Sequence, residues 1–343
     1  MLRTIHCLLL FALLLAGCHG PSVRAKVNAT VRPDFPTPGN SSGVEAQGVP
    51  ETDEVCGPTI ALIDVDGLLL NTNFTGIGAQ GENPVSLFRE RLDAIAADPC
   101  VKGVVVRINS YGGGVTATDI MWHDLTRFKQ RTNLPVVACL MDVAAGGAYY
   151  LATAADQIVA HPTSVTGGVG VILNLYNMQD AMAQFNVIGV PIKAGTNADM
   201  GTPIKPMDPE GRALLQTMAE EFHTRFKEVV TNARPGVDSS DSTLFDGRVF
   251  TARQAHERHL VDVVGYLDDA TTAARELAGC REAQLVLYHR CGDRAHSAYA
   301  ISPNTPLQTS MMPLSLPGLD RSRLPSFLYI WQPEPTMERL SGK

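Results

Sequence analysis

Short apolar runs alternate with longer segments of helical period from Thr59 onward. The runs at residues 60–65, 103–108, 135–140 and 157–160 are nearly continuous, which is typical of strands that are buried inside a sheet. Because the intervening segments are long enough for helices of ten or more residues, the strands are expected to be joined by right-handed crossovers. The pattern therefore predicts an α/β fold with a mostly parallel sheet.

Helices are predicted where apolar residues recur every three or four positions. Asn83 followed by Pro84 marks the start of the first helix, and further helices are expected over residues 115–130 and 148–155. The later chain continues the alternation, with a helix over 176–185, a strand over 187–194, a long helix over 209–232, and helical segments over 251–260 and 268–278. One stripe of the long helix carries its apolar residues: Leu214, Met218, Phe222, Phe226 and Val229.

The periodicity fades after Cys280, and the rest of the chain is rich in proline. One apolar stretch, residues 324–331, stands out in this tail. It is either an edge strand or a contact with a neighbouring subunit.

The N-terminus carries a targeting signal. Arg3 precedes an apolar run that is too short to cross a membrane as a mature helix, and the run ends in Leu-Ala-Gly-Cys at residues 15–18. This ending resembles the bacterial lipobox, which implies that Cys18 is acylated and becomes the first residue after cleavage. An ordinary signal peptide is the alternative. His19 stands where lipoproteins retained in the inner membrane usually carry Asp, so outer-membrane attachment is favoured.

Composition narrows the function further. Of 343 residues, 45% are hydrophobic and 18% are charged, which is the balance of a globular protein with a sizeable core. The formal net charge of −7 leaves no basic field that would attract nucleic acid. No C-x-x-C pair occurs and the cysteine spacings match no zinc site, so we expect neither a metal nor a cofactor.

Three glycine-rich turns follow successive predicted strands, at residues 109–114, 142–152 and 163–172. Because the ends of parallel strands meet at one edge of a sheet, these turns predict a single cleft there. Glycine leaves backbone N–H groups free to bind an anion or an oxyanion. Val115 and Thr116 stand where a phosphate loop needs Lys and Ser or Thr, so nucleotide binding is not expected.

Four segments, at residues 108–115, 149–156, 166–171 and 246–251, resemble the signal peptide peptidase A (SppA) family. The similarity covers roughly residues 58–280 in unbroken order. It implies a ClpP/crotonase-like ββα superhelix, a serine nucleophile with a lysine general base in active members, and ring-shaped homo-oligomers at a membrane.

Both positions of the implied dyad are substituted. The family's Ala-Ser-Gly-Gly-Tyr-Tyr turn places the nucleophile at Gly146 when it is aligned on the tyrosine pair, or at Ala145 when it is aligned on the glycine pair. The family's base falls on Ala198, and Lys193 and Lys205 are too far along the chain simply to replace it. Covalent catalysis needs a nucleophile and a base within hydrogen-bonding reach, so the Ser-Lys reaction is not expected.

Other groups of the site are less affected by these losses. The backbone N–H groups of Gly113 and Gly147 are expected to persist as an oxyanion hole, because they need no side chain. Asp64 and Asp66 alternate with apolar residues in the first strand and are expected to orient a turn. The substitute nucleophiles considered are Ser110, Ser164, Thr166 and Cys139, with His161 the nearest base in sequence.

The sequence thus predicts a lipoprotein leader over 1–17, a lipidated tether over 18–57, an SppA-like domain over 58–280 and a proline-rich extension over 281–343. We expect a lipid-anchored protein of the bacterial cell envelope that faces the periplasm. It would be a catalytically impaired relative that binds peptides, or scaffolds a homo-oligomer or an active paralogue. The alternatives are an active serine-type endopeptidase with an unusual nucleophile and a crotonase-like acyl-thioester enzyme.

Overall fold

The computed structural model describes residues 44–48, 57–72, 75–76, 79–80, 83–290 and 327–331. The predicted leader, Cys18, most of the tether and most of the C-terminal extension lie outside these residues, so their boundaries stay predictions. Within the described part of the chain, no helix is both long and apolar enough to cross a membrane.

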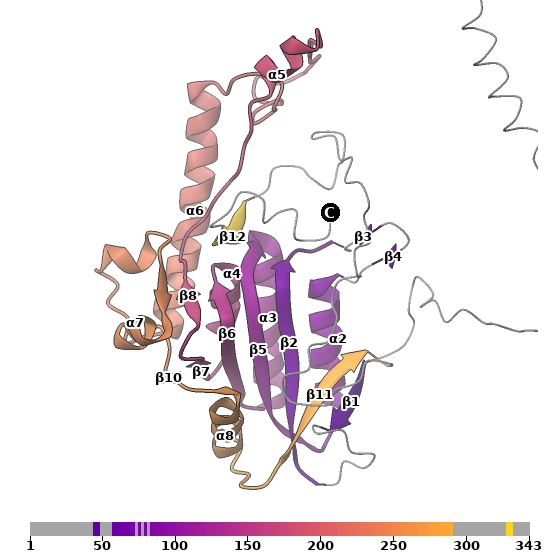
Figure 1. Cartoon of the computed structure of the whole chain (residues 1–343), viewed down its shortest axis with the longest axis vertical. Helices are drawn as coiled ribbons and strands as arrows, with labels where there is room; N and C mark the ends of the chain where they lie inside the picture. Colours follow the sequence, from indigo (N-terminus) through magenta and orange to yellow (C-terminus); the bar gives the residue numbers. More distant parts are fainter. Residues whose placement is uncertain are drawn as a thin grey trace, which may run out of the picture. The chain divides into compact units, whose positions relative to one another are not determined.

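One large sheet organises the described chain (Figure 1). Its strand order is β1 (Val44–Gly48), β11 (Gln284–Arg290), β2 (Thr59–Leu69), β5 (Val101–Gly114), β6 (Val136–Ala145), β7 (Gln157–Ala160) and β10 (Val263–Val264). From β11 to β10 every neighbouring pair is parallel, and β1 is antiparallel to β11. The predicted α/β class with a mostly parallel sheet is therefore confirmed.

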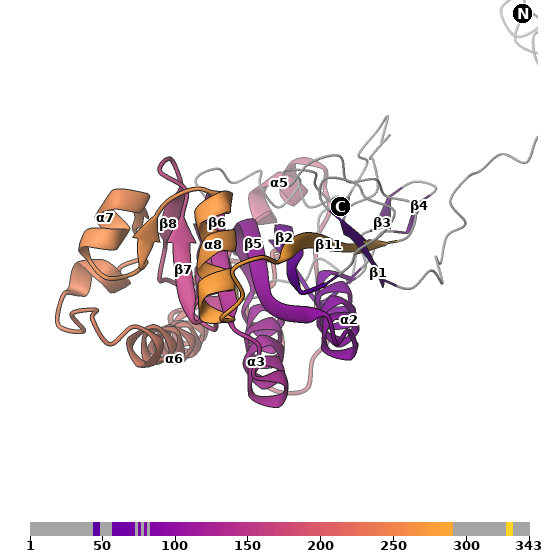
Figure 2. The ribbon, with the colours of Figure 1, turned by 90° about the horizontal axis from the view of Figure 1, so that it is seen from below.

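Helices cover both faces of this sheet (Figure 2). α2 (Pro84–Ala97) and α3 (Val115–Thr132) pack on one face with α4 (Gly147–Ala152), and α8 (Leu267–Leu277) packs on the other. The alternating side chains of the strands feed two separate hydrophobic clusters, as expected for strands that are buried on both sides. This double burial explains why the strands appear in the sequence as continuous apolar runs.

The predicted helix starts follow from local chemistry. The Asn83 side chain accepts hydrogen bonds from the backbone N–H groups of Val85 at 3.0 Å and Ser86 at 3.3 Å, while Pro84 occupies the first turn of α2, where no N–H is needed. α3 ends at Asn133, whose left-handed backbone (φ 54°) stops the helix. The start predicted from Asn83 and Pro84 is confirmed, and both residues act on the helix that directly follows them.

The first glycine-rich segment differs from its prediction. Residues 109–114 were expected to form a turn, but they are the end of β5, which runs straight into α3. They stay extended because both sides find partners: β2 pairs with Gly112 and Gly113 on one side, and β12 (Leu328–Ile330) pairs antiparallel with Gly112–Gly114 on the other. The apolar stretch of the tail, left open between a strand and a subunit contact, thus supplies a strand of this sheet.

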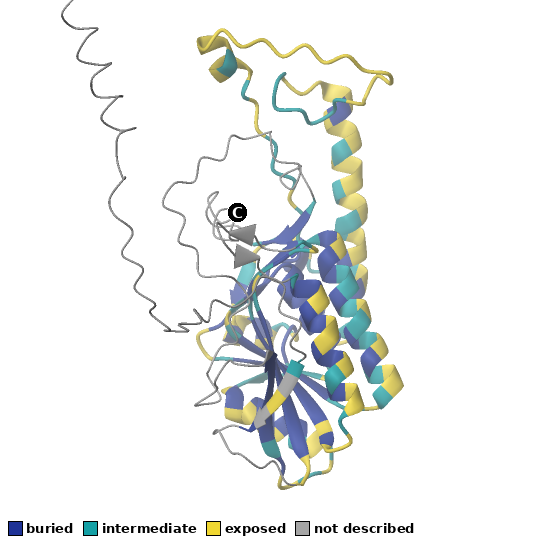
Figure 3. Cartoon of the chain, turned by 90° about the vertical axis from the view of Figure 1, so that its right-hand side faces the viewer, coloured by how far each residue is buried: buried dark blue, intermediate teal, exposed yellow. Residues whose placement is uncertain are grey.

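The segment between the sheet and the long helix also differs from its prediction. No strand forms over residues 187–194, and the helix expected over 176–185 is only α5 (Gln179–Gln184). This segment and the first half of α6 (Pro209–Ala233) extend away from the sheet (Figure 1) and are largely exposed (Figure 3). We call residues 173–208 the arm.

Smaller elements complete the described chain. β8 (Val165–Gly167) pairs with β6 and with β9 (Val249–Thr251), and β3 (Thr75–Gly76) pairs with β4 (Ala79–Gln80). The 3-10 helix η1 (Ser242–Phe245) precedes β9, and α7 (Ala252–Glu257) follows it.

Candidate active site

The three glycine-rich segments meet, as the sequence predicted. The backbone N–H of Gly146 donates to the Gly167 carbonyl at 2.9 Å, and a Cβ atom added to Gly168 would lie 3.1 Å from the Gly146 nitrogen. A Cβ atom added to Gly112 would lie 2.6 Å from the Gly147 nitrogen. A side chain at Gly112 would therefore collide with the backbone, and one at Gly168 would be tight, so this junction between β5, β6 and β8 favours glycine.

The junction is occupied by the chain itself. A Cβ atom added to Gly146 would lie 2.6 Å from the carbonyl oxygen of Tyr329 and 2.9 Å from its carbonyl carbon. The Tyr329 carbonyl oxygen also lies against Gly112, and it would be 3.1 Å from a Cβ atom on Gly147. One backbone carbonyl of β12 therefore rests among the three glycines that line the predicted nucleophile position.

Gly146 is the residue of a sharp turn between strand β6 and helix α4, with φ 57° and ψ −125°. A side chain is strained in this backbone region, yet strand-to-helix turns of this kind are where hydrolases present a nucleophile. Ala145, the position given by the other alignment, is the last residue of β6 and pairs with Gly167. Of the two candidates, Gly146 has the backbone geometry of a nucleophile position, and it has no side chain.

The predicted oxyanion donors Gly113 and Gly147 both lie at the Tyr329 carbonyl. Gly113 is directly opposite Tyr329 in the antiparallel β5/β12 ladder. The hydrogen bonds from Val115 N to Phe327 O (3.2 Å) and from Trp331 N to Tyr111 O (3.0 Å) flank this pair. Since hydrogen-bonded pairs alternate along an antiparallel ladder, the Gly113/Tyr329 pair is of the hydrogen-bonded kind.

Gly147 begins α4 and must also be glycine. A Cβ atom here would collide with the Thr118 hydroxyl, which is fully buried. The sequence analysis did not identify Thr118 or Tyr329 as parts of this site, because neither belongs to a glycine-rich segment. The apolar stretch 324–331 was the one sequence signal that could have pointed to Tyr329.

The predicted base position lies in a different environment. Ala198 is exposed on the arm, in a turn where its N–H donates to the Gly195 carbonyl at 3.3 Å. The arm lies beyond the end of the sheet in both side views (Figures 1 and 3). Lys193 and Lys205 both form ion pairs with Asp199, at 2.5 and 2.8 Å, and these bonds lower the pKa of the Asp199 carboxyl to about 2.

Two of the substitute nucleophiles, Ser110 and Thr166, are held in structural roles, and the other two are buried. The Ser110 hydroxyl donates to the Gly67 carbonyl at 2.5 Å and accepts from Gly112 N at 3.0 Å, so it shapes the end of β5. The Thr166 hydroxyl donates to the Ala144 carbonyl at 2.7 Å. Ser164 and Cys139 are fully buried, and burial raises the pKa of the Cys139 thiol to about 12, so it stays a thiol rather than the nucleophilic thiolate.

His161, the nearest base in sequence, is also engaged locally. Its ring Nδ1 lies 2.8 Å from the Thr163 hydroxyl, and its ring packs edge-on against Tyr266. The bond from Ser164 N to the His161 carbonyl, at 2.8 Å, joins backbone atoms and does not connect the two side chains. None of these arrangements resembles a nucleophile held by a base.

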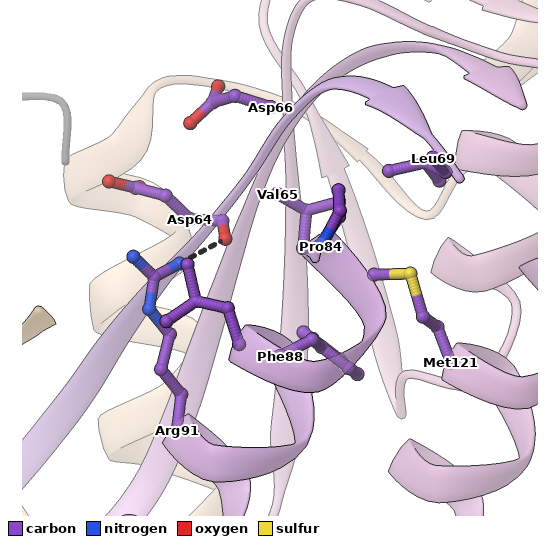
Figure 4. Close-up of a pocket in the computed structure, with 9 residues that line it drawn as sticks. Asp64, Val65, Asp66, Leu69, Pro84, Phe88, Arg91 and Met121 are labelled. Atoms are coloured by element: carbon purple, nitrogen blue, oxygen red, sulfur yellow. Dashed lines mark hydrogen bonds between the residues drawn. The ribbon is translucent and has the colours of Figure 1, made fainter. Parts of the chain in front are cut away.

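The two aspartates of β2 lie near its end, Asp64 buried and Asp66 partly exposed (Figure 4). Asp64 is buried and accepts from the Arg107 guanidinium at 2.7 Å, and Arg91 donates to the Asp64 backbone carbonyl at 2.7 Å. Burial, together with the neighbouring Asp64 charge, raises the pKa of Asp66 to about 7. Within the described ranges, no group of three or more His, Cys, Asp or Glu side chains is arranged to hold a metal ion.

Comparisons with known proteins point to one family. The family model for peptidase family S49 matches residues 128–281. Protease 4 from Salmonella typhi is 28% identical over 279 residues, and a putative signal peptide peptidase SppA from Enterococcus faecium is 27% identical over 229 residues. A putative protease from Methanocaldococcus jannaschii is 30% identical over 213 residues.

These alignments cover 81%, 67% and 62% of this chain, and 42%, 66% and 68% of the three relatives. The chain thus spans less than half of the Salmonella protein and about two thirds of the other two. On the strength of these matches, the chain belongs to peptidase family S49, the family of the SppA-type signal peptide peptidases.

Proposed function

We propose that this chain is a membrane-anchored, SppA-like protein that has lost peptidase activity and retains the peptide groove. One observation carries the proposal: Gly146, which has no side chain, lies at the nucleophile turn directly beneath a backbone carbonyl of the same chain. A serine Cβ atom here would lie 2.6 Å from the oxygen and 2.9 Å from the carbon of the Tyr329 carbonyl, so the turn has no room for a nucleophile while β12 is in place. Without a serine hydroxyl, the site can bind a peptide but has no atom with which to form an acyl-enzyme.

The chemistry of the remaining groups supports the same conclusion. Acyl transfer by a serine-lysine dyad needs the hydroxyl and the base within about 3 Å of each other. Ala198 has no titratable group, and the two nearest lysines are paired with Asp199. The oxyanion donors alone retain a modest effect over water, on the order of a thousandfold in other proteases, far below a working peptidase.

Membrane attachment is the second part of the proposal, and it rests on the sequence. Cys18 follows a leader that resembles a lipobox, so acylation would tie the chain to the bacterial envelope with the S49 domain facing the periplasm. The test is metabolic labelling with an alkyne fatty acid in a bacterial host. Wild type should be labelled and fractionate with the envelope, and Cys18→Ala should lose both properties. Labelling of the Cys18→Ala chain would contradict the anchor.

Assembly with further copies is the third part. The arm exposes apolar side chains that a soluble monomer seldom leaves uncovered, among them Phe185 (80% exposed) and Ile188 (81% exposed). Leu214 and Met218, on the predicted apolar stripe of α6, are also exposed. A second copy of this chain, or an active paralogue of the same fold, would cover this surface.

The loss of catalysis is tested with a fluorophosphonate probe and a peptide library. The wild-type chain should neither label nor cleave, while an active serine hydrolase added to the same sample does both. Gly146→Ser combined with Ala198→Lys is the reconstruction variant. Because Tyr329 occupies the site, we expect this variant to stay inactive unless β12 is displaced. Cleavage by the wild-type chain would overturn the proposal, and the labelled residue would identify the nucleophile.

A further inference from the structure

The segment 327–331 is held in the manner of a peptide ligand. Its inner edge pairs with Gly112–Gly114 of β5, and its outer edge pairs with Ile172: Leu328 N donates to Ile172 O at 2.9 Å, and Ile172 N donates to Leu328 O at 3.0 Å. A short strand that pairs with β5 on one edge and forms a single bridge to Ile172 on the other makes the main-chain contacts of β-strand addition. Main-chain contacts of this kind would hold any extended peptide.

Selectivity comes from the side chain of Tyr329, which is fully buried. Its ring stacks on Tyr150 with centroids 5.4 Å apart and contacts Phe226 at 4.7 Å. Its hydroxyl donates to the Phe222 carbonyl at 2.6 Å. The pocket therefore offers an aromatic wall for a ring and one acceptor for a phenol hydroxyl, which fits tyrosine better than any other side chain.

Two flanking aromatic contacts extend this pattern. Phe327 packs edge-on against Phe222 at 5.1 Å, and Trp331 stacks on Tyr111 at 5.9 Å. Alternate residues of a strand point to the same face, so the residues at positions −2, 0 and +2 relative to Tyr329 are the ones recognised. The groove is thus lined for an extended segment with tyrosine at its centre and aromatic residues two positions away on each side.

The Tyr329 carbonyl lies against Gly146, the predicted nucleophile position, and Tyr329 is opposite Gly113, one predicted oxyanion donor. It lies closer to Gly146 than a substrate could lie to a serine, because a Cβ atom there would be only 2.6 Å from the carbonyl oxygen. Residues 291–326 separate this segment from β11, so it is joined to the domain through a long connection. A tethered ligand competes at an effective concentration of roughly millimolar, which free peptides at micromolar concentrations cannot match.

We infer that the groove between β5 and Ile172 is a binding site for tyrosine-centred extended peptides, and that residues 327–331 of the same chain are its resident ligand. The inference rests on the proposed function only in treating this groove as the peptide site of the fold. It adds that the groove is closed to external peptides while its own segment is bound. It also gives a reason for glycine at position 146, since any side chain there would collide with the resident carbonyl.

The test uses the full chain and a fluorescein-labelled peptide, Phe-Leu-Tyr-Ile-Trp, blocked at both ends. Wild type should bind it weakly, because the groove is filled. Tyr329→Ala, whose own segment has lost its anchor, should bind at least tenfold more tightly. The same peptide with alanine in place of tyrosine should bind neither chain. Tyr329→Phe is the matched control: it keeps the ring and should stay closed, like wild type.

A second variant guards against misfolding of Tyr329→Ala. A protease recognition sequence is placed within residues 306–311, so that the connection can be cut after folding. Cutting, followed by separation of the C-terminal fragment, should raise affinity for the tyrosine peptide at least tenfold over the uncut chain. Equal affinity for the tyrosine peptide before and after the cut would overturn the inference. So would a cut chain that stays folded but prefers the alanine peptide, or that binds neither peptide. Tight binding only between intact copies, with a dimer forming as concentration rises, would also overturn the assignment of the ligand to the same chain.

The fate of the bound peptide separates this inference from the proposed function. Mass spectrometry of the peptide after incubation with the opened variants should show it intact. Binding followed by cleavage would contradict the loss of catalysis and leave the binding site standing. If the opened variants neither bind nor cleave the peptide, the binding site is contradicted and the loss of catalysis still stands.

Discussion

The two regions that would carry a Ser-Lys dyad differ in almost every physical property. The nucleophile turn at Gly146 is buried, built from glycine and filled by Tyr329. The base position Ala198 lies on an exposed arm that carries uncovered apolar side chains and one ion-pair network. The comparison teaches that the two predicted positions differ in their surroundings: at the turn a strand of the same chain fills the space beside Gly146, whereas the space around Ala198 is open to solvent.

The largest expected effect tests how strongly the groove depends on its occupant. Tyr329→Ala removes a fully buried ring and should lower the free energy of unfolding by about 3–5 kcal/mol, as measured by urea denaturation. Tyr176→Ala on the arm, where the ring is 58% exposed, is the matched control and should cost about 0.5 kcal/mol or less. Similar costs at the two positions would mean that β12 does not pack as described.

A glycine pair sharpens the comparison further. Gly146→Ala and Gly195→Ala both place a side chain at positive φ, 57° and 99°. At Gly146 the new Cβ also meets the Tyr329 carbonyl, whereas at Gly195 its nearest neighbour is 3.9 Å away. We expect about 2–4 kcal/mol of destabilisation at Gly146, from strain plus collision, against about 1 kcal/mol at Gly195. Thermal unfolding of both variants measures the difference. Equal losses of stability would show that the Tyr329 carbonyl does not restrict the side chain at position 146.

Two carboxyls with opposite pKa shifts predict opposite pH dependence. The raised pKa of Asp66, about 7, means that the folded chain keeps this proton between about pH 4 and 7 while the unfolded chain releases it. Stability should therefore fall as pH rises through this range. Asp66→Asn should remove the fall, which is on the order of 2 kcal/mol for a partly exposed group.

Asp199 works in the other direction. Its pKa is lowered to about 2, so its ion pairs stabilise the fold above about pH 4 and are lost as pH falls toward 2. Asp199→Asn should remove the fall in unfolding free energy below about pH 4 and leave the pH dependence between pH 4 and 7 unchanged. Urea denaturation of wild type and both variants from pH 2.5 to 8 measures the two effects. An Asp66→Asn profile that still falls above pH 4 would show that another group is responsible.

The smallest effect on stability concerns the arm. Ile188→Glu changes an exposed side chain and should alter the free energy of unfolding of the monomer by no more than about 0.5 kcal/mol. If further copies cover the arm, the same change should lower the mass of the assembly in light scattering. Leu277→Glu, exposed on α8 away from the arm, is the control and should leave the mass unchanged. If Ile188→Glu leaves the mass of the assembly unchanged, the arm is not the contact between copies.

The reliability of the sequence predictions followed the range of the interactions behind them. The start of α2 was predicted correctly because Asn83 and Pro84 act on the helix that they adjoin. The strand expected over residues 187–194 is absent, although its pattern is apolar, because that segment has no neighbouring strand within the described structure and is left exposed. The segment 109–114 has the composition of a turn, yet it is a strand because residues 328–330 pair with it.

The sequence by itself determined the alternation of strands and helices, the family resemblance, and the absence of a serine at Gly146 and of a lysine at Ala198. Those features depend on residue type and on contacts between near neighbours, which a linear pattern records. Only the tertiary structure decided that residues 328–330 pair with the glycine-rich end of β5 and that the Tyr329 carbonyl lies against Gly112 and Gly146. Pairing between segments that are some two hundred residues apart depends on backbone hydrogen bonds and on the packing of a whole ring, and neither leaves a period in the sequence.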